Sequence, residues 1–258
     1  MNRITLIFGA LLAAAPTLAQ PPPADARDPH AYAEGAEFTR GAFRPHLADV
    51  HNFGSVLLDN FELTRVNGRT SIPYDLEAWF GRTFDRAMLK AEGEIEQGQI
   101  AEGRTELLWG HAIAPFWDSQ IGVRYDSGPG PNRNWAAFGV EGLAPYRFEI
   151  EVTGYVGESS RTALRVDASY DMLITQKLIL QPRLEANFYG KQDIERGLGS
   201  GLSDLSAGLR LRYEVRRELA PYIGIERVNE YGNTEKFTRV AGGDPNDTQF
   251  VAGLRYWF

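Results

Sequence analysis

The chain has 258 residues, a formal net charge of −7 and no cysteine. An acidic chain of this length suits one or two domains and argues against nucleic acid as a partner. The lack of cysteine excludes disulfides, thiolate metal sites and a lipoprotein anchor. The 27 glycines, 14 Phe, 11 Tyr and 5 Trp suit a β architecture with many turns and interfacial rings.

The first 50 residues carry two predicted segments. "MNRITLIFGALLAAAPTLAQ" combines the charge of Arg3, an apolar run too short to span a bilayer, and a small-residue cleavage site that ends at Ala19. We therefore expect residues 1–19 to be a secretory signal peptide. Residues 20–50 are rich in Pro, Gly and Ala without periodicity, which predicts an extended periplasmic arm.

From residue 51 to residue 258, apolar and polar residues alternate. In "RFEIEVTGYV", for example, Phe148 and Ile150 share one face, and Glu149 and Glu151 share the other. Strict alternation over eight or more residues is typical of half-buried strands. The pattern predicts twelve strands, near 51–65, 71–81, 86–95, 104–112, 118–126, 135–143, 147–156, 162–173, 177–189, 204–216, 221–230 and 248–258.

The predicted connections differ in length at the two ends of these strands. Those after even-numbered strands are short, such as "IAPFW", "APY" and "ITQ", whereas most of the others are longer and more polar, such as "EQGQIAEG" and "GKQDIERGLGSGLS". Short turns on one side and long loops on the other are typical of an outer-membrane barrel. A soluble sandwich or a lipocalin-like barrel would show the same alternation. Likewise, the charged rows on the polar faces fit either a water-exposed surface or pairing across a hydrated lumen.

The last segment, "TQFVAGLRYWF", favours the membrane alternative. Its alternate residues form one predicted lipid-facing stripe: Phe250, Ala252, Leu254, Tyr256 and Phe258. A terminal aromatic residue with another two places before it resembles the assembly signal of bacterial outer-membrane barrels, so we expect the barrel assembly machinery to bind at Phe258. Closure of this strand against the first would satisfy edge hydrogen bonds that lipid cannot. The predicted fold is an all-β, transmembrane antiparallel barrel at 51–258 in the outer membrane of a Gram-negative bacterium, with lipid around it.

Several longer segments carry a family resemblance. "LADVHNFGSVLLDNFEL", "GVRYDSGPGPNRNWAAFGVEGLAPYRFE" and the stretch from Leu173 to Glu214 are similar to the copper-resistance protein B family of copper-tolerant Gram-negative bacteria. The resemblance runs from about Asp28 to Phe258. It implies a role in copper resistance and metal homeostasis, by sequestering or passing copper ions at the outer membrane. It also implies a periplasmic multicopper oxidase as a partner.

One departure from the family is the near absence of a Met- and His-rich segment before the barrel, because residues 20–49 hold only two histidines and no methionine. Copper binding would then depend on few side chains. Imidazole suits Cu(II) and thioether suits Cu(I), and in the predicted topology the candidates lie toward the periplasmic end. The candidate ligands are His30, His46, His51, Met88 and His111, the first two resting mainly on the resemblance. Met172 shares a face with apolar residues and is expected to meet lipid, and a place in an interfacial aromatic girdle is the alternative for His111.

Two other functions compete with copper binding. A narrow outer-membrane pore without metal specificity would have the same strand pattern. A barrel-embedded hydrolase would need a nucleophile, a base and an orienting acid. The predicted barrel holds only His51 and His111 as bases, with Ser55 near the first, so we expect the protein not to be an enzyme.

Overall fold

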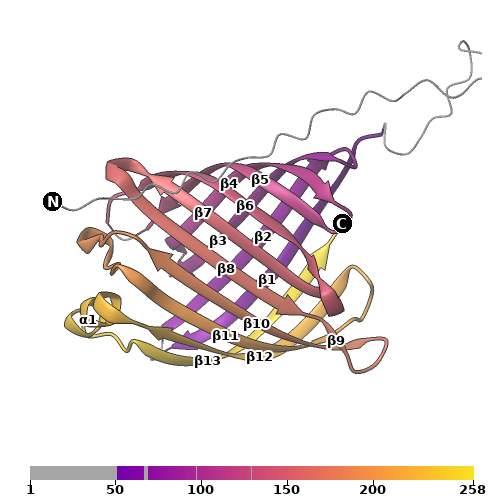
Figure 1. Cartoon of the computed structure of the whole chain (residues 1–258). Coiled ribbons are helices and arrows are strands. Elements are labelled where there is room, and N and C mark those ends of the chain that lie inside the picture. The colour runs from indigo at the N-terminus through magenta and orange to yellow at the C-terminus, as the bar shows by residue number, and fades with distance from the viewer. Residues whose placement is uncertain (1–50, 67–68, 97, 129) are drawn as a thin grey trace, which may run out of the picture. The chain divides into compact units, whose positions relative to one another are not determined.

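The computed structural model describes residues 51–258 except 67, 68, 97 and 129 (Figure 1). Neighbouring strands in this part of the chain pair antiparallel, and β1 pairs with β13, so the sheet closes on itself. β8 and β9 are successive pieces of one strand that both pair with β10, which leaves twelve strands around the barrel. The strands are β1 (Phe53–Val66), β2 (Arg69–Gly81), β3 (Asp85–Glu96), β4 (Gln99–Ala114), β5 (Trp117–Ser127), β6 (Arg133–Ala144), β7 (Phe148–Gly157), β8 (Arg161–Tyr170), β9 (Met172–Leu173), β10 (Leu178–Tyr189), β11 (Gly201–Tyr213), β12 (Leu219–Glu230) and β13 (Asn246–Trp257).

The closing strand has the predicted two faces. Phe250 and Phe258 are 78% and 66% exposed on the outside, whereas Val251 is buried inside. The main chains of Val56 and Phe258 exchange two hydrogen bonds, of 2.9 and 3.0 Å. Closure therefore leaves no free sheet edge along β1 and β13, as a lipid environment requires.

The same alternation separates outside from inside in the other strands. Large apolar side chains such as Leu107, Val123 and Phe138 are 58%, 58% and 54% exposed on the outer face. Charged side chains such as Arg165 and Arg210 are each 6% exposed because they point into the lumen. This inverted arrangement confirms the predicted transmembrane barrel and excludes the soluble alternatives, which would bury their apolar face. The predicted signal peptide and arm lie outside the described residues and stay predictions.

The connections follow the predicted asymmetry with one exception. The β10–β11 and β12–β13 connections are long, and the second contains α1 (Gly232–Val240); in Figure 1 α1 lies at the end of the barrel opposite the C-terminus. The loop predicted from "EQGQIAEG" is wrong, because β3 runs to Glu96 and β4 starts at Gln99. We call the two ends of the barrel the C-terminal end and the α1 end. No helix in the described part of the chain is long and apolar enough to cross a membrane.

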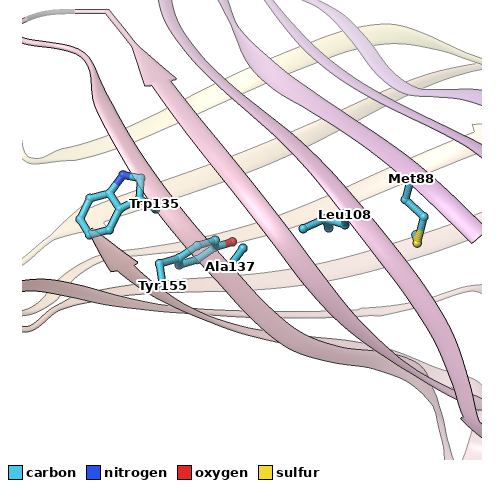
Figure 2. Packing of buried hydrophobic residues seen from close by; sticks show 5 residues of the cluster. All are labelled: Met88, Leu108, Trp135, Ala137 and Tyr155. Atoms are coloured by element: carbon cyan, nitrogen blue, oxygen red, sulfur yellow. The ribbon is translucent and has the colours of Figure 1, made fainter. Parts of the chain in front are cut away.

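A small apolar cluster lines part of the inner wall. Figure 2 shows Met88 at one end of a row that passes Leu108 and ends at Trp135, with Ala137 and Tyr155 beside it. The polar tips of the aromatic members bind charged groups: Trp135 Nε1 donates to Asp126 at 2.8 Å and the Tyr155 hydroxyl donates to Glu106 at 2.9 Å. The cluster therefore joins the inner wall to the charged groups of the lumen.

Candidate functional site: the charged lumen

Ion pairs cross the lumen at mid-height. Arg183 of β10 donates through Nε to Asp167 at 2.7 Å and through Nη1 to Asp75 of β2 at 3.3 Å. Arg165 of β8 donates through Nη2 both to Glu185 and to Glu92 of β3, each at 2.9 Å. Four strands separate β10 from β2, and four separate β8 from β3, on the shorter way round the barrel. We call Arg183–Asp75 and Arg165–Glu92 the cross-lumen pairs.

Two cavities lie on either side of these pairs. One, of about 530 Å³, is lined by Arg86, Asp118 and Arg255 and lies toward the C-terminal end. The other, of about 440 Å³, is lined by Glu62, Arg196 and Thr234 and lies toward the α1 end. We call them the C-terminal chamber and the α1 chamber. Four residues line both chambers and so mark the division between them: Asp75, Glu92, Arg104 and Arg183.

Both chambers are acidic. Among the described residues that line the C-terminal chamber, ten carry carboxylates and six carry basic groups. In the α1 chamber the corresponding numbers are ten and five. A lumen with low-dielectric walls and excess carboxylates concentrates cations and repels anions.

Lys90 of β3 crosses the C-terminal chamber. Its Nζ donates to Glu141 of β6 at 2.8 Å and to Glu151 of β7 at 2.9 Å. Gln120 lies 3.5 Å from the same nitrogen. An ammonium group of the chain therefore occupies a place among carboxylates that would otherwise face the lumen unpaired.

Met88, a predicted thioether ligand, points inward from β3 and is 1% exposed. Its sulfur accepts from Gln120 Nε2 at 3.8 Å. A Cβ atom added to Gly110 on the neighbouring strand would lie 2.9 Å from that sulfur, so the glycine leaves the room that Met88 occupies.

His111, a predicted imidazole ligand, lies on the other side of the barrel wall. It shares the outer face of β4 with Leu107 and Trp109, and its ring centroid lies 5.6 Å from that of Trp109. Its Nδ1 lies 2.9 Å from Asp85 Oδ1. The sequence placed Met88 and His111 at the same end, which the strand register bears out, but the wall separates them and they do not form one site.

The remaining predicted ligands lie toward or beyond the edge of the described chain. His51 is exposed and lies two residues before the start of β1. His30 and His46 lie outside the described residues. In the part of the chain that the structure describes, no group of three or more His, Asp or Glu side chains has the arrangement of a metal site.

The serine hydroxyls near His111 and at the start of β1 are arranged differently from those of a catalytic triad. Asp85 and His111 are paired on the outer face, and Ser119 lies opposite His111 on β5. The Ser119 hydroxyl, however, donates to the main-chain oxygen of His111 at 3.2 Å. Ser55 donates to the main-chain oxygen of Phe258 at 3.2 Å. In the described part of the chain both hydroxyls therefore donate to main-chain carbonyl oxygens.

The connections at the α1 end are joined by another group of ion pairs. Asp193, in the β10–β11 connection, accepts from Arg133 Nε at 2.8 Å and lies 3.3 Å from Arg161 Nε. Arg133 also binds Glu195 at 2.8 Å. The hydrogen bonds from Arg133 hold the pKa of Asp193 below its usual range. The sequence pattern did not indicate this group, because its members come from the first residues of β6 and β8 and from the β10–β11 connection.

Comparison with known proteins identifies the family. The family model described as copper resistance protein B precursor (CopB) matches residues 52–258. The Copper resistance protein B of Escherichia coli is 46% identical over 203 residues, which cover 79% of this chain and 69% of that protein. The chain belongs to the copper resistance protein B family. A homolog of that name from Pseudomonas syringae pv. tomato is 43% identical over 200 residues, which cover 78% of this chain and 68% of the homolog.

A solved structure supports the fold of this copper resistance protein B family member. The NanC porin aligns with a TM-score of 0.50 over 79% of this chain and 99% of the porin, at 10% identity. The closed twelve-strand barrel with its apolar outer face is the architecture of a Gram-negative outer-membrane protein. The family match begins at residue 52, so it contains Met88, His111 and the cross-lumen pairs, whereas His30, His46 and His51 precede it.

Proposed function

We propose that this chain confers copper resistance at the outer membrane by binding copper ions and passing them along its lumen. The observation that carries the proposal is the match to copper resistance protein B over the whole barrel, with the Escherichia coli relative 46% identical. The acidic chambers supply the physical complement, because their excess carboxylates attract a metal cation. Copper is the cargo here, not a resident cofactor.

The ligands proposed for copper divide into two groups by their place in the barrel. Met88 offers a thioether to Cu(I) on the inner wall, and His51 offers an imidazole to Cu(II) beside the first strand. His30 and His46 belong with His51 in the proposal, as residues of the predicted arm. His111 would need a separate site on the outer face, where Asp85 orients its imidazole.

Partners beyond lipid are also proposals. The family resemblance supports a periplasmic multicopper oxidase that would exchange copper with the C-terminal end of the barrel. The aromatic stripe of the last strand supports recognition by the barrel assembly machinery. Neither partner is required for the barrel itself to bind copper.

Calorimetric titration of the refolded protein with Cu(I) and with Cu(II) tests the copper proposal. We expect Met88→Leu to weaken Cu(I) binding and His51→Ala to weaken Cu(II) binding. His111→Ala should leave copper binding in the lumen unchanged. Leucine is the matched replacement at Met88 because it fills the buried volume without the sulfur. If the unmodified chain gave the same heat signals as a variant that lacks the side chains of His51, Met88 and His111, a pore without metal specificity would be the better account.

Growth of a copper-sensitive Gram-negative host that expresses the chain tests the cellular role. We expect expression to raise the copper concentration that the host tolerates and to leave its zinc tolerance unchanged. An equal rise for both metals, or no rise for copper, would contradict a copper-specific role.

A further inference from the structure

The cross-lumen pairs connect nearly opposite walls of the barrel. Arg183 and Arg165 are carried by neighbouring strands, β10 and β8, and their partners Asp75 and Glu92 are carried by β2 and β3. The two pairs therefore lie side by side across the same level of the lumen. β10 and β2 are not neighbours in the sheet, nor are β8 and β3, so side chains bridge the lumen between them.

Each arginine is fixed to its own wall before it reaches across. Arg165 binds Glu185 through Nε at 3.0 Å and through Nη2 at 2.9 Å, and Arg183 binds Asp167 at 2.7 Å. A planar guanidinium held in this way presents its remaining N–H groups in a fixed direction. The arginine side chains are 7% and 21% exposed, so little water separates them from their partners. Each cross-lumen pair is thus held in place by a carboxylate of the arginine's own wall and completed by a carboxylate of the opposite wall.

Because these pairs lie between two cavities, they affect the movement of ions along the lumen. A cation in either chamber is surrounded by excess carboxylates, but to cross from one chamber to the other it must pass a level where arginines contribute positive charge. Rings of charged side chains at a constriction set both passage and selectivity.

We propose that Arg165 and Arg183 are the selectivity-determining gate of the lumen: with both cross-lumen pairs made, the lumen is closed to ions, and release of Asp75 and Glu92 opens it as a cation path. This inference rests on the proposed function in that the ion which the gate would admit is the copper cargo. The gate itself acts on charge and applies to any small cation.

Conductance of the full chain in planar lipid bilayers, in potassium chloride without copper, tests the gate. The double variant Arg165→Gln, Arg183→Gln removes both cross-lumen pairs and leaves their carboxylate partners, of which Glu92 keeps its ion pair with Arg104 of β4. We expect its conductance to exceed that of the unmodified chain at least about tenfold, with a reversal potential in a salt gradient that shows preference for potassium.

The complementary variant opens the same gap with the opposite charge. Asp75→Asn together with Glu92→Gln releases both pairs but leaves the arginines on their own wall, held by Asp167 and Glu185. We expect its conductance to rise as well, while its reversal potential shifts toward chloride. Mere loosening of the barrel would change the reversal potential of both variants in the same direction, and that result would overturn the proposal.

A matched control removes an inward arginine away from the gate. Arg212 binds Asp171 at 2.6 Å and lines a third cavity, of about 350 Å³, that shares Arg255 with the C-terminal chamber. Both cross-lumen pairs stay made in Arg212→Gln, so this variant should keep the conductance of the unmodified chain. High conductance of the unmodified chain, equal to that of the variants, would also overturn the proposal. Should a double variant fail to fold, Asp75→Asn and Arg183→Gln alone break the same pair from its two sides and give the same comparison. Because potassium and chloride carry the current, the outcome is independent of the copper titrations.

Discussion

At the scale of single residues, the lumen is held by charges that satisfy one another. Lys90 binds two carboxylates from two other strands and has a side chain that is 15% exposed. A charge placed in a low-dielectric interior is costly when its partner is removed, even where the intact pair adds little net stability. The residues of such a group therefore depend on one another.

Replacement of Lys90 tests this dependence. We expect Lys90→Met to lower the free energy of unfolding by roughly 1–3 kcal/mol, because Glu141 and Glu151 would face each other without a cation. Urea unfolding in lipid vesicles measures the change. Lys90→Arg should retain most of the stability, and Glu141→Gln together with Glu151→Gln should restore part of it in the Lys90→Met background. Equal stability of Lys90→Met and the unmodified chain would show that water already screens the carboxylates.

The sequence predicted which face a residue occupies only where the alternation was strict. The alternation in the strand 86–95 places Met88 on the same polar face as Lys90, and Met88 does point inward. The alternation does not assign a face to His111, because the consecutive residues Leu107 and Leu108 are both apolar. The partners across the lumen could not be predicted, since Arg165 and Glu92 are 73 residues apart and meet only through the stagger of a closed barrel.

At the scale of elements, the sequence predicted that the strands exist but not where each of them ends. The polar segment 96–103 predicts a loop, yet β4 begins within it and pairs there with the end of β3, from Glu96↔Gln99 to Gly93↔Gly103. A strand that extends beyond the lipid has no apolar face, so hydrophobic alternation cannot show where it stops. Gly98, at φ +80°, allows the tight turn there. The folded β10–β11 connection depends likewise on partners from other elements.

Acid should loosen the β10–β11 connection only at low pH. The pKa of Asp193 is lowered in the folded state, first of all by its hydrogen bonds from Arg133, so its contribution is fully present above the unfolded pKa of about 3.8 and is lost as the pH falls through the lower folded value. A fluorophore on Ile194→Cys, which is 67% exposed in a chain without cysteine, reports the state of the connection. We expect a constant signal from pH 7 to about pH 4 and a change below that.

The variant Asp193→Asn separates this cause from general acid unfolding. It removes the charge that Arg133 and Arg161 bind, so the signal at neutral pH should already resemble that of the acid form. A transition in the unmodified chain centred above pH 4, or one that persists unchanged in Asp193→Asn, would assign the acid response to other carboxylates.

At the scale of the whole molecule, the barrel has apolar side chains outside and charged side chains inside, so its outer apolar belt requires lipid. The outer face of β4 shows the belt in one strand: Leu107, Trp109 and Ile113 are 58%, 52% and 57% exposed. Leu107 lies near the middle of the strand and Ile113 lies near its C-terminal end. The two positions share a face and differ in depth, so they can measure where the hydrocarbon begins.

Arginine substitutions at these two positions test the membrane placement of the entire fold. A cation at the bilayer midplane costs about 2–4 kcal/mol and one near the interface about 0–1 kcal/mol. We therefore expect Leu107→Arg to lower the free energy of unfolding in vesicles by the larger amount and Ile113→Arg by the smaller. In detergent micelles, which adapt their thickness, the difference between the two variants should shrink. Equal costs in vesicles would mean that Leu107 and Ile113 lie at similar depths in the bilayer. The middle of the barrel, with its cross-lumen pairs, would then not lie at the membrane centre.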